Sequence, residues 1–199
     1  HALNNINLKI DDRETVAIIG ESGAGKSTLL HIMSCIDNFD GEYYLDNIDI
    51  NKLSESKKSK LRSSKIGIVL QDFALIDDFT VFENVMTPLY FNKKIKDKKG
   101  SVMRALKKTG IASLKSKKVS QLSGGQKQRV AISRALVTSP EYIFADEPTG
   151  SLDSKTSEEI VKMLFDLNRN GITIVIVTHN LEIANQCHHI IEIKDGNII

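Results

Sequence analysis

Apolar and polar positions along the chain follow two alternating patterns. Short runs of aliphatic and aromatic residues indicate strands that are buried on both faces of a sheet. Between these runs, apolar residues recur three and four positions apart, which indicates helices. Strands that alternate with helices are typical of an α/β fold whose mainly parallel sheet is covered on both faces. The buried strands are expected at 15–19, 66–70, 142–145 and 172–177, and the helices at 26–34, 52–62, 126–138, 154–168 and 181–186.

The two ends of the chain predict the edges of this fold. Alternating apolar residues at 3–10 and a short segment at 42–45 predict strands of a small antiparallel part near the N-terminus. Residues 190–199 predict a last strand and a closing hairpin. Because the first predicted strand starts almost at His1, which is not a methionine, we expect the chain to begin inside a domain.

The middle of the chain changes character. Between 73 and 138 the strand signals disappear and helical spacing takes over, most clearly at 81–86. We therefore expect a nucleotide-binding core made of 1–72 and 139–199, with an inserted helical subdomain at about 73–138. The lysine-rich run at 93–99 is interpreted as a solvated basic loop without a role.

Composition narrows the function classes. The 199 residues suffice for one large domain, and 27 basic against 25 acidic residues leave a net charge of +2. This balance argues against a dedicated nucleic-acid binder, so no nucleic-acid partner is expected. Cys35 and Cys187 lack metal-ligand spacing and are read as small buried hydrophobes in a reducing compartment. No apolar run approaches the roughly 18 residues of a membrane span, and no signal peptide is visible.

The segment from Gly20 to Ser27 fits the phosphate-loop pattern G-x-x-x-x-G-K-[ST] at every fixed position. It joins a predicted strand to a predicted helix, where backbone N–H groups and the positive helix end can hold phosphates. Lys26 is expected to reach the β- and γ-phosphates, and the Ser27 hydroxyl to bind Mg²⁺. An ordinary turn with a chance lysine is the alternative, but the pattern arises by chance in under about one per cent of such chains. The expected nucleotide contacts are Gly20, Glu21, Ser22, Gly23, Ala24, Gly25, Lys26, Ser27 and Thr28.

A second buried strand ends in two carboxylates. Asp146 directly follows this strand, the position of an acid that holds Mg²⁺ beside a phosphate loop. Glu147 comes next and is placed to orient and deprotonate an attacking water. A merely polar strand end is the alternative, and the phosphate loop upstream makes the functional interpretation the better one.

The string Leu122-Ser123-Gly124-Gly125-Gln126 opens the predicted helix at 126–138 and offers a second set of backbone donors. One ATP has no evident need for two such sites in one subunit. The string is identical to the signature of ATP-binding cassette (ABC) ATPases, and the chain resembles that family over essentially its whole length. Matching motifs in the family's order are Gln71 (Q-loop), 150–153 (D-loop) and His179 (switch histidine).

The resemblance implies a P-loop NTPase (RecA-like) core and ATP with Mg²⁺ as cofactors. Two copies of the domain are expected to pack head to tail. In that dimer Ser123, Gly125 and Gln126 of one copy contact the ATP held by Lys26 of the other. For the remaining motifs, the resemblance implies contacts with nucleotide, water or metal: Gln71 on Mg²⁺ or the water, Asp153 at the nucleotide site, and His179 on the γ-phosphate beside the attacking water.

Two features depart from the family pattern. An aromatic residue that stacks on adenine usually precedes the segment matching 3–10, so the expected position lies upstream of His1 and adenine recognition stays unassigned. The turn before the second strand usually reads Gly-Glu but here reads Arg13-Glu14, which is expected to alter only that turn.

Several stretches resemble macrolide, lipoprotein-releasing and bacteriocin exporters, namely 71–76, 83–85 and 145–153. This resemblance implies an ATPase subunit on the cytoplasmic face of the cell membrane, where it drives an integral-membrane permease. A non-transport ABC regulator, such as a cell-division type ATPase, is the alternative. The compact single cassette argues against repair and translation factors. Neither the cargo nor the direction of transport follows from the sequence.

Overall fold

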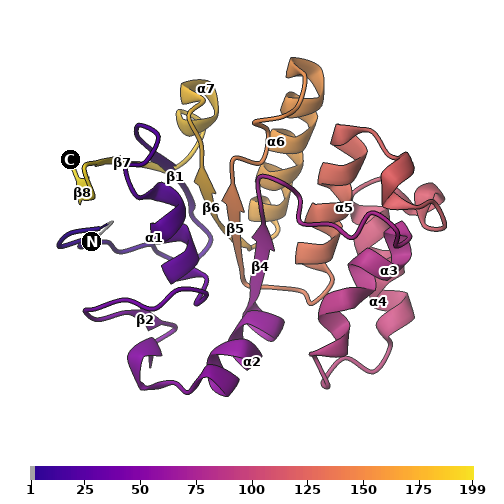
Figure 1. Cartoon of the computed structure of the whole chain (residues 1–199), viewed down its shortest axis with the longest axis horizontal. Helices are drawn as coiled ribbons and strands as arrows, with labels where there is room; N and C mark the ends of the chain where they lie inside the picture. Colours follow the sequence, from indigo (N-terminus) through magenta and orange to yellow (C-terminus); the bar gives the residue numbers. More distant parts are fainter. Residues whose placement is uncertain (1–2) are drawn as a thin grey trace.

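A computed structural model describes residues 3–199, which include the whole strand predicted at 3–10. A six-stranded sheet organises the molecule in the order β4-β5-β6-β1-β7-β8 (Figure 1). Its first five strands are parallel and β8 is antiparallel to β7, which confirms the predicted closing hairpin. The strands are β1 (Thr15–Ile19), β4 (Ile66–Val69), β5 (Tyr142–Asp146), β6 (Thr173–Val177), β7 (His189–Lys194) and β8 (Asn197–Ile198).

The central strands are buried on both faces, as their continuous apolar runs predict. Along β5, Ile143 and Ala145 face one apolar cluster while Phe144 faces the other. The period of two along a strand sends successive side chains to opposite faces of the sheet. The α/β fold with a mainly parallel, two-sided sheet is therefore confirmed.

Helices cover the two faces from different parts of the chain. The helix α1 (Lys26–Met33) packs against β5 and β6 on one face, and α6 (Ser154–Arg169) packs against β6 on the other. The helix predicted at 52–62 is present as α2 (Glu55–Lys65), three residues further along the chain, and a 3₁₀ turn, η1 (Ile50–Lys52), precedes it. A short helix, α7 (Leu181–Ala184), precedes β7.

Between β4 and β5 the chain is helical, and Figure 1 shows α3, α4 and α5 together at one side of the sheet. We call the helices from α3 to α5 the helical lobe. Buried apolar residues of the helical lobe and of the sheet belong to one continuous core cluster. The elements of the helical lobe are α3 (Val81–Met86), η2 (Thr87–Tyr90), α4 (Lys98–Lys108), η3 (Ala112–Leu114), η4 (Val119–Gln121) and α5 (Gly124–Leu136).

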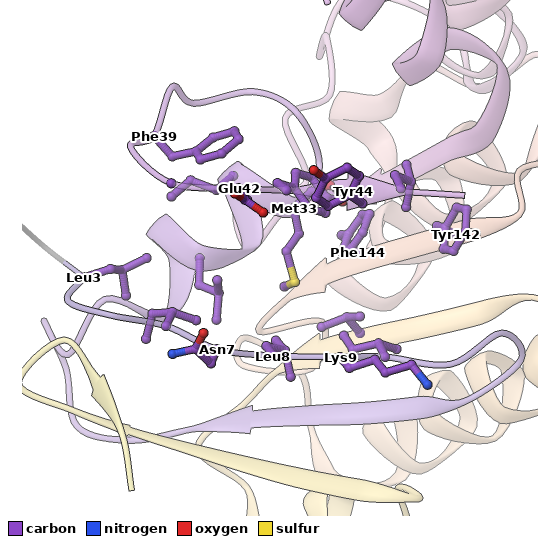
Figure 2. Close-up of a pocket in the computed structure, with 18 of the residues that line it drawn as sticks. Leu3, Asn7, Leu8, Lys9, Met33, Phe39, Glu42, Tyr44, Tyr142 and Phe144 are labelled. Carbon is purple, nitrogen blue, oxygen red and sulfur yellow. Dashed lines mark hydrogen bonds between the residues drawn. The ribbon is translucent and has the colours of Figure 1, made fainter. Parts of the chain in front are cut away.

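The strand predicted at 3–10 is wrong. The segment's apolar residues pack against the core, but its described residues form no strand. Within the described part of the chain, the one backbone–backbone hydrogen bond of residues 3–10 joins the Asn4 N–H to the Gly196 carbonyl at 2.7 Å. A cavity of about 1430 Å³ separates the segment from the antiparallel hairpin of β2 (Tyr44–Leu45) and β3 (Ile48–Asp49) (Figure 2). The alternating apolar side chains of 3–10 pack against the core, but no strand lies beside their backbone to form hydrogen bonds with it.

The turn between β2 and β3 is tied to the sheet by Asp46. Its carboxylate accepts hydrogen bonds from the Lys65 ammonium and the Tyr142 hydroxyl. Burial raises the pKa of Asp46, but these two bonds together with the positive charge of Lys65 outweigh burial and leave the pKa below its ordinary value. The carboxylate therefore stabilises the folded protein as long as it is ionised.

Replacing Asp46 with Asn is expected to lower the free energy of unfolding by about 1 kcal/mol at pH 7. A carboxyl whose pKa is lower in the folded state contributes stability that is complete above its unfolded pKa near 4 and disappears as the pH falls through the folded pKa. The difference between wild type and variant should therefore shrink below about pH 4 in urea unfolding. Asp40→Asn, at an exposed position, is the control. A difference independent of pH would contradict the assignment.

Candidate functional site

The topology of the sheet gathers the phosphate loop and the predicted residues at the ends of β4, β5 and β6 on one side of the sheet. Neighbouring parallel strands end together at their carboxyl ends, which is where α/β proteins bind ligands. The phosphate loop follows β1, Gln71 follows β4, Asp146 ends β5, and His179 follows β6. The register pairs Val177 with both Ile18 and Asp146, so these strand ends lie side by side.

The phosphate loop is shaped by glycines and by the β7–β8 hairpin. Gly20 has φ +143°, and a Cβ there would lie 2.1 Å from the Ile193 carbonyl oxygen, so only glycine fits. The Gly196 N–H donates to the Ala24 carbonyl at 3.2 Å. The loop is thus held by chain segments more than 160 residues away, a contact that the motif alone did not reveal.

Lys26 begins α1 and bends back over the loop. Its Nζ donates to the carbonyl oxygens of Gly20 and Glu21 at 2.8 and 2.7 Å. Gly25 precedes the helix at φ +105° and gives it no side-chain cap, so the first N–H groups of α1 stay available for an anion. The first turn carries Ser27 and Thr28 next to Lys26, as predicted.

Glu147 and His179 meet although 32 residues separate them. His179 Nδ1 lies 2.9 Å from Glu147 Oε1, while Glu147 Oε2 is buried and has no hydrogen-bond partner in the described part of the chain. The Glu147 side chain is 12% exposed and that of His179 is 73% exposed. Glu147 has φ +43°, a rare conformation for a non-glycine residue and one that is concentrated at functional sites. A carboxylate and an imidazole therefore lie together where β5 and β6 end.

Asp146 fits the metal role expected of it. The residue is 7% exposed, and its Oδ1 is buried with no hydrogen-bond partner among the described residues. A buried carboxylate oxygen without a donor is costly unless a ligand compensates it. Carboxylate and hydroxyl oxygens are the donors that Mg²⁺ prefers, so Asp146 with Ser27 suits this ion.

The signature residues lie elsewhere in the molecule. Ser123 caps α5 in a capping box with Gln126, whose N–H donates to Ser123 Oγ at 3.4 Å. Among the described residues, no hydrogen bond joins 123–126 to 20–28. Figure 1 shows α1 and α5 on opposite sides of the central strands.

The signature instead packs against the start of α6. Asp153 caps that helix and accepts a hydrogen bond from the Thr156 N–H at 3.0 Å. A Cβ on Gly125 would lie 2.4 Å from Thr156 Cγ2, so this glycine permits the close approach of the two helix starts. The structure therefore brings Ser123, Gly125 and Asp153 together, but not with Lys26.

Gln71 is exposed just beyond β4, and the loop after it is held by a residue that sequence reasoning missed. Arg134 on α5 donates to the Phe73 carbonyl at 2.7 Å and to the Ala74 carbonyl. The sequence did contain one signal for Arg134, because a basic residue stands among the mainly apolar buried residues of this helix.

Comparison with known proteins identifies the arrangement. The model of the ABC transporter family matches residues 3–150.

The chain belongs to the ABC transporter family.

Its relatives place it among ATP-binding cassettes. The ABC transporter ATP-binding protein MJ0796 of Methanocaldococcus jannaschii is 46% identical over 100% of this chain and 87% of that protein. The macrolide export ATP-binding/permease protein MacB of Mannheimia succiniciproducens is 44% identical over 100% of this chain, which spans 31% of MacB. The resemblance to the macrolide-exporter type of ABC ATPase is thereby confirmed.

A solved structure bears on the chemistry. The dimeric post-hydrolysis state of the ATP-binding cassette MJ0796, bound to ADP and Pi, superposes with a TM-score of 0.91 and 44% identity over 99% of this chain and 88% of that chain. The ABC domain described here is accordingly an ATP-binding ATPase. None of its helices within residues 3–199 combines the length and apolar character needed to cross a membrane.

Proposed function

We propose that this ATPase works as a head-to-tail dimer that drives export through a membrane permease from the cytoplasmic face of the cell membrane. The observation that carries the proposal is the separation of the signature from the phosphate loop within one chain. Both segments are fully formed, and each offers N–H donors at the start of a helix. Two copies related by a twofold axis can place each signature opposite the partner's phosphate loop, which completes two sites.

Within each site, the chain's own residues have separate tasks. Lys26 exchanges its carbonyl partners for the β- and γ-phosphates of ATP, and the loop N–H groups hold the same oxygens. Ser27, Asp146 and Gln71 are the proposed ligands of Mg²⁺, which when bound neutralises charge that develops on the phosphates. Glu147 takes the proton from the attacking water, and His179 holds the Glu147 carboxylate while facing the γ-phosphate.

The helical lobe is the proposed contact with the permease, in keeping with its proposed boundaries at about 73–138. Tyr90 and Phe91 are 67% and 72% exposed, although aromatic side chains usually bury much of their surface. Residues 73–138 carry fourteen basic and four acidic side chains, so this part holds a net charge of +10 within a nearly neutral chain. A positive, partly apolar surface suits a partner at an anionic membrane face.

Peptides, bacteriocins, drugs and lipoproteins are the proposed range of exported substrates. The identity to MacB, a macrolide export protein that combines the ATPase with a permease, supports export. The alternative, a cell-division type regulator, shares the same cassette chemistry. The two differ in whether the permease partner moves a cargo, so transport into vesicles that contain the partner decides between them.

Complementation between two inactive variants tests the composite site. Lys26→Ala and Ser123→Arg are each expected to lower ATP hydrolysis below about 1% of wild type. A mixed dimer has one doubly disabled site and one intact site, because each variant supplies what the other lacks. An equimolar mixture should therefore recover up to about a quarter of wild-type activity, since half of the dimers are mixed and each has one of two sites.

The control is a mixture of Lys26→Ala with the double variant Lys26→Ala/Ser123→Arg, whose mixed dimers contain no intact Lys26. No recovery is expected there. Failure of the first mixture to exceed the control, with ATP-dependent dimers present in light scattering, would sink the composite site.

A further inference from the structure

The loop that follows Gln71 has an unusual backbone. Phe73 and Ala74 are consecutive residues with φ of +62° and +44°, although neither is glycine. Side chains with a Cβ rarely adopt this left-handed conformation, and it persists only where the surroundings impose it. Most of the segment 72–79 is exposed, so few contacts are available to do so.

Beside the packing of Phe73 and Leu75 against the core, Arg134 supplies two hydrogen bonds to this segment. Its guanidinium reaches from α5 and donates through Nη2 to the Phe73 carbonyl at 2.7 Å and through Nη1 to the Ala74 carbonyl. The planar fork of arginine suits two adjacent acceptors, which a lysine cannot serve in the same geometry. Burial lowers the pKa of Arg134, and the nearby Asp72 carboxylate opposes that shift. The side chain is half-buried and spans from the helix to the loop.

The far end of the same loop is tied to the helical lobe as well. Asn84 on α3 is 1% exposed, accepts from the Ile76 N–H at 2.9 Å and donates to the Ile76 carbonyl at 3.0 Å. The helices α3 and α5 pack against each other. The loop is thus fastened to the helical lobe at two places, whereas Gln71 remains attached to the sheet through β4.

The helix that carries Arg134 also carries the signature. Ser123 caps α5, and Arg134 lies eleven residues further along the same helix, about 17 Å at 1.5 Å per residue. The helix α5 runs without interruption from the signature to Arg134. A displacement of its signature end can therefore reach the loop beside Gln71 through the two hydrogen bonds of Arg134, in addition to the packing of α5 against α3 and β4.

We propose that Arg134 is a positioning residue, which couples the signature helix to Gln71 of the same chain. When Ser123 engages the nucleotide held by the partner copy, α5 shifts, and Arg134 carries the shift to Gln71 at the chain's own nucleotide. The inference rests on the roles proposed above for Gln71 and for the composite site.

The test is a double-mutant cycle with Arg134→Gln and Gln71→Ala in the purified full-length protein. Arg134→Gln is expected to lower kcat for ATP hydrolysis about tenfold while the Kd for ATP changes less than about twofold. In the Gln71→Ala background the same change should alter kcat less than about twofold, because its route of action is already lost. Arg134→Lys should fall between Arg134→Gln and wild type.

Arg129 is the matched control. It lies on the same helix and donates to the Thr109 carbonyl at 2.9 Å and to Glu159 at 2.7 Å, away from the loop after Gln71. Arg129→Gln is expected to lower the thermal midpoint of unfolding at least as much as Arg134→Gln but to leave kcat within about twofold.

Three results would overturn the proposal. The first is that Arg134→Gln lowers kcat by the same factor in the wild type and in the Gln71→Ala background. The second is that Arg134→Gln weakens ATP binding as much as it lowers kcat. The third is equal loss of kcat in the Arg129 control. If Gln71→Ala by itself leaves kcat unchanged, the role proposed for Gln71 fails first and Arg134 has nothing to position. Should Arg134→Gln fail to fold, Arg134→Lys passes through the same cycle under the same criteria.

Discussion

Replacing Glu147 with Gln should lower kcat for ATP hydrolysis at least about 100-fold, the usual scale for loss of a general base. The amide keeps the size of the side chain and can still meet His179, whose Nδ1 lies 2.9 Å from Glu147 Oε1. It cannot accept a proton from water at neutral pH. ATP affinity should stay within about twofold, because the phosphate loop is untouched.

Stalled hydrolysis should leave ATP-bound dimers in place. Phosphate release in single-turnover experiments measures the chemical step, and light scattering with ATP measures the dimer. Glu158→Gln, an exposed position on α6, is the control for loss of one negative charge. Hydrolysis near the wild-type rate in Glu147→Gln would remove this residue from the role of base and leave His179 as the candidate.

Replacing Gly20 with Ala should disrupt the phosphate loop, although the change adds only one methyl group. The added Cβ would lie 2.1 Å from the Ile193 carbonyl oxygen, and φ at Gly20 is +143°. Backbone atoms cannot rotate away as a flexible side chain can. The loop, the β7–β8 hairpin or both must move, so ATP affinity should fall at least about tenfold.

Gly41→Ala separates the two causes. Gly41 also has a positive φ, +124°, but nothing lies within 4 Å of a Cβ there. Both variants bear the backbone strain, and only Gly20→Ala bears the collision. Urea unfolding should show Gly20→Ala less stable than the control by about 1–3 kcal/mol. Equal losses of stability and of ATP affinity in the two variants would show that the contact with Ile193 is unimportant.

The two acidic residues at the end of β5 affect the energetics of nucleotide binding. Asp146 and Glu147 each keep one buried carboxylate oxygen that accepts no hydrogen bond from any residue in 3–199. Such oxygens can accept a hydrogen bond from a ligand or bind a metal ion. Binding of ATP with Mg²⁺ is therefore expected to stabilise the folded protein, because it engages these acids as well as the phosphate loop.

The sequence by itself determined the features that depend on local pattern. The buried strand before Asp146 was predicted because a run of apolar residues needs no knowledge of its neighbours to indicate burial on both faces. The phosphate loop was recognised because glycine, lysine and serine at this fixed spacing can bind the same phosphate group. The family followed from motifs of the same kind, read in order along the chain.

The error at 3–10 shows where local pattern stops. Alternation correctly indicated that one side of this segment faces apolar residues, and its side chains do pack against the core. A strand also needs hydrogen bonds to a neighbouring strand, and the period of side chains carries no information about that neighbour. A cavity lies there instead.

Only the tertiary structure decided which distant residues meet. It paired Glu147 with His179, backed Gly20 with Ile193, and set Arg134 on the loop beyond Gln71. It also placed α1, which begins at Lys26, and α5, which Ser123 caps, on opposite sides of the central strands. These contacts depend on strand order and on helix packing, which are properties of the whole chain. Sequence spacing fixes what each residue can do, and the fold fixes what each residue can reach.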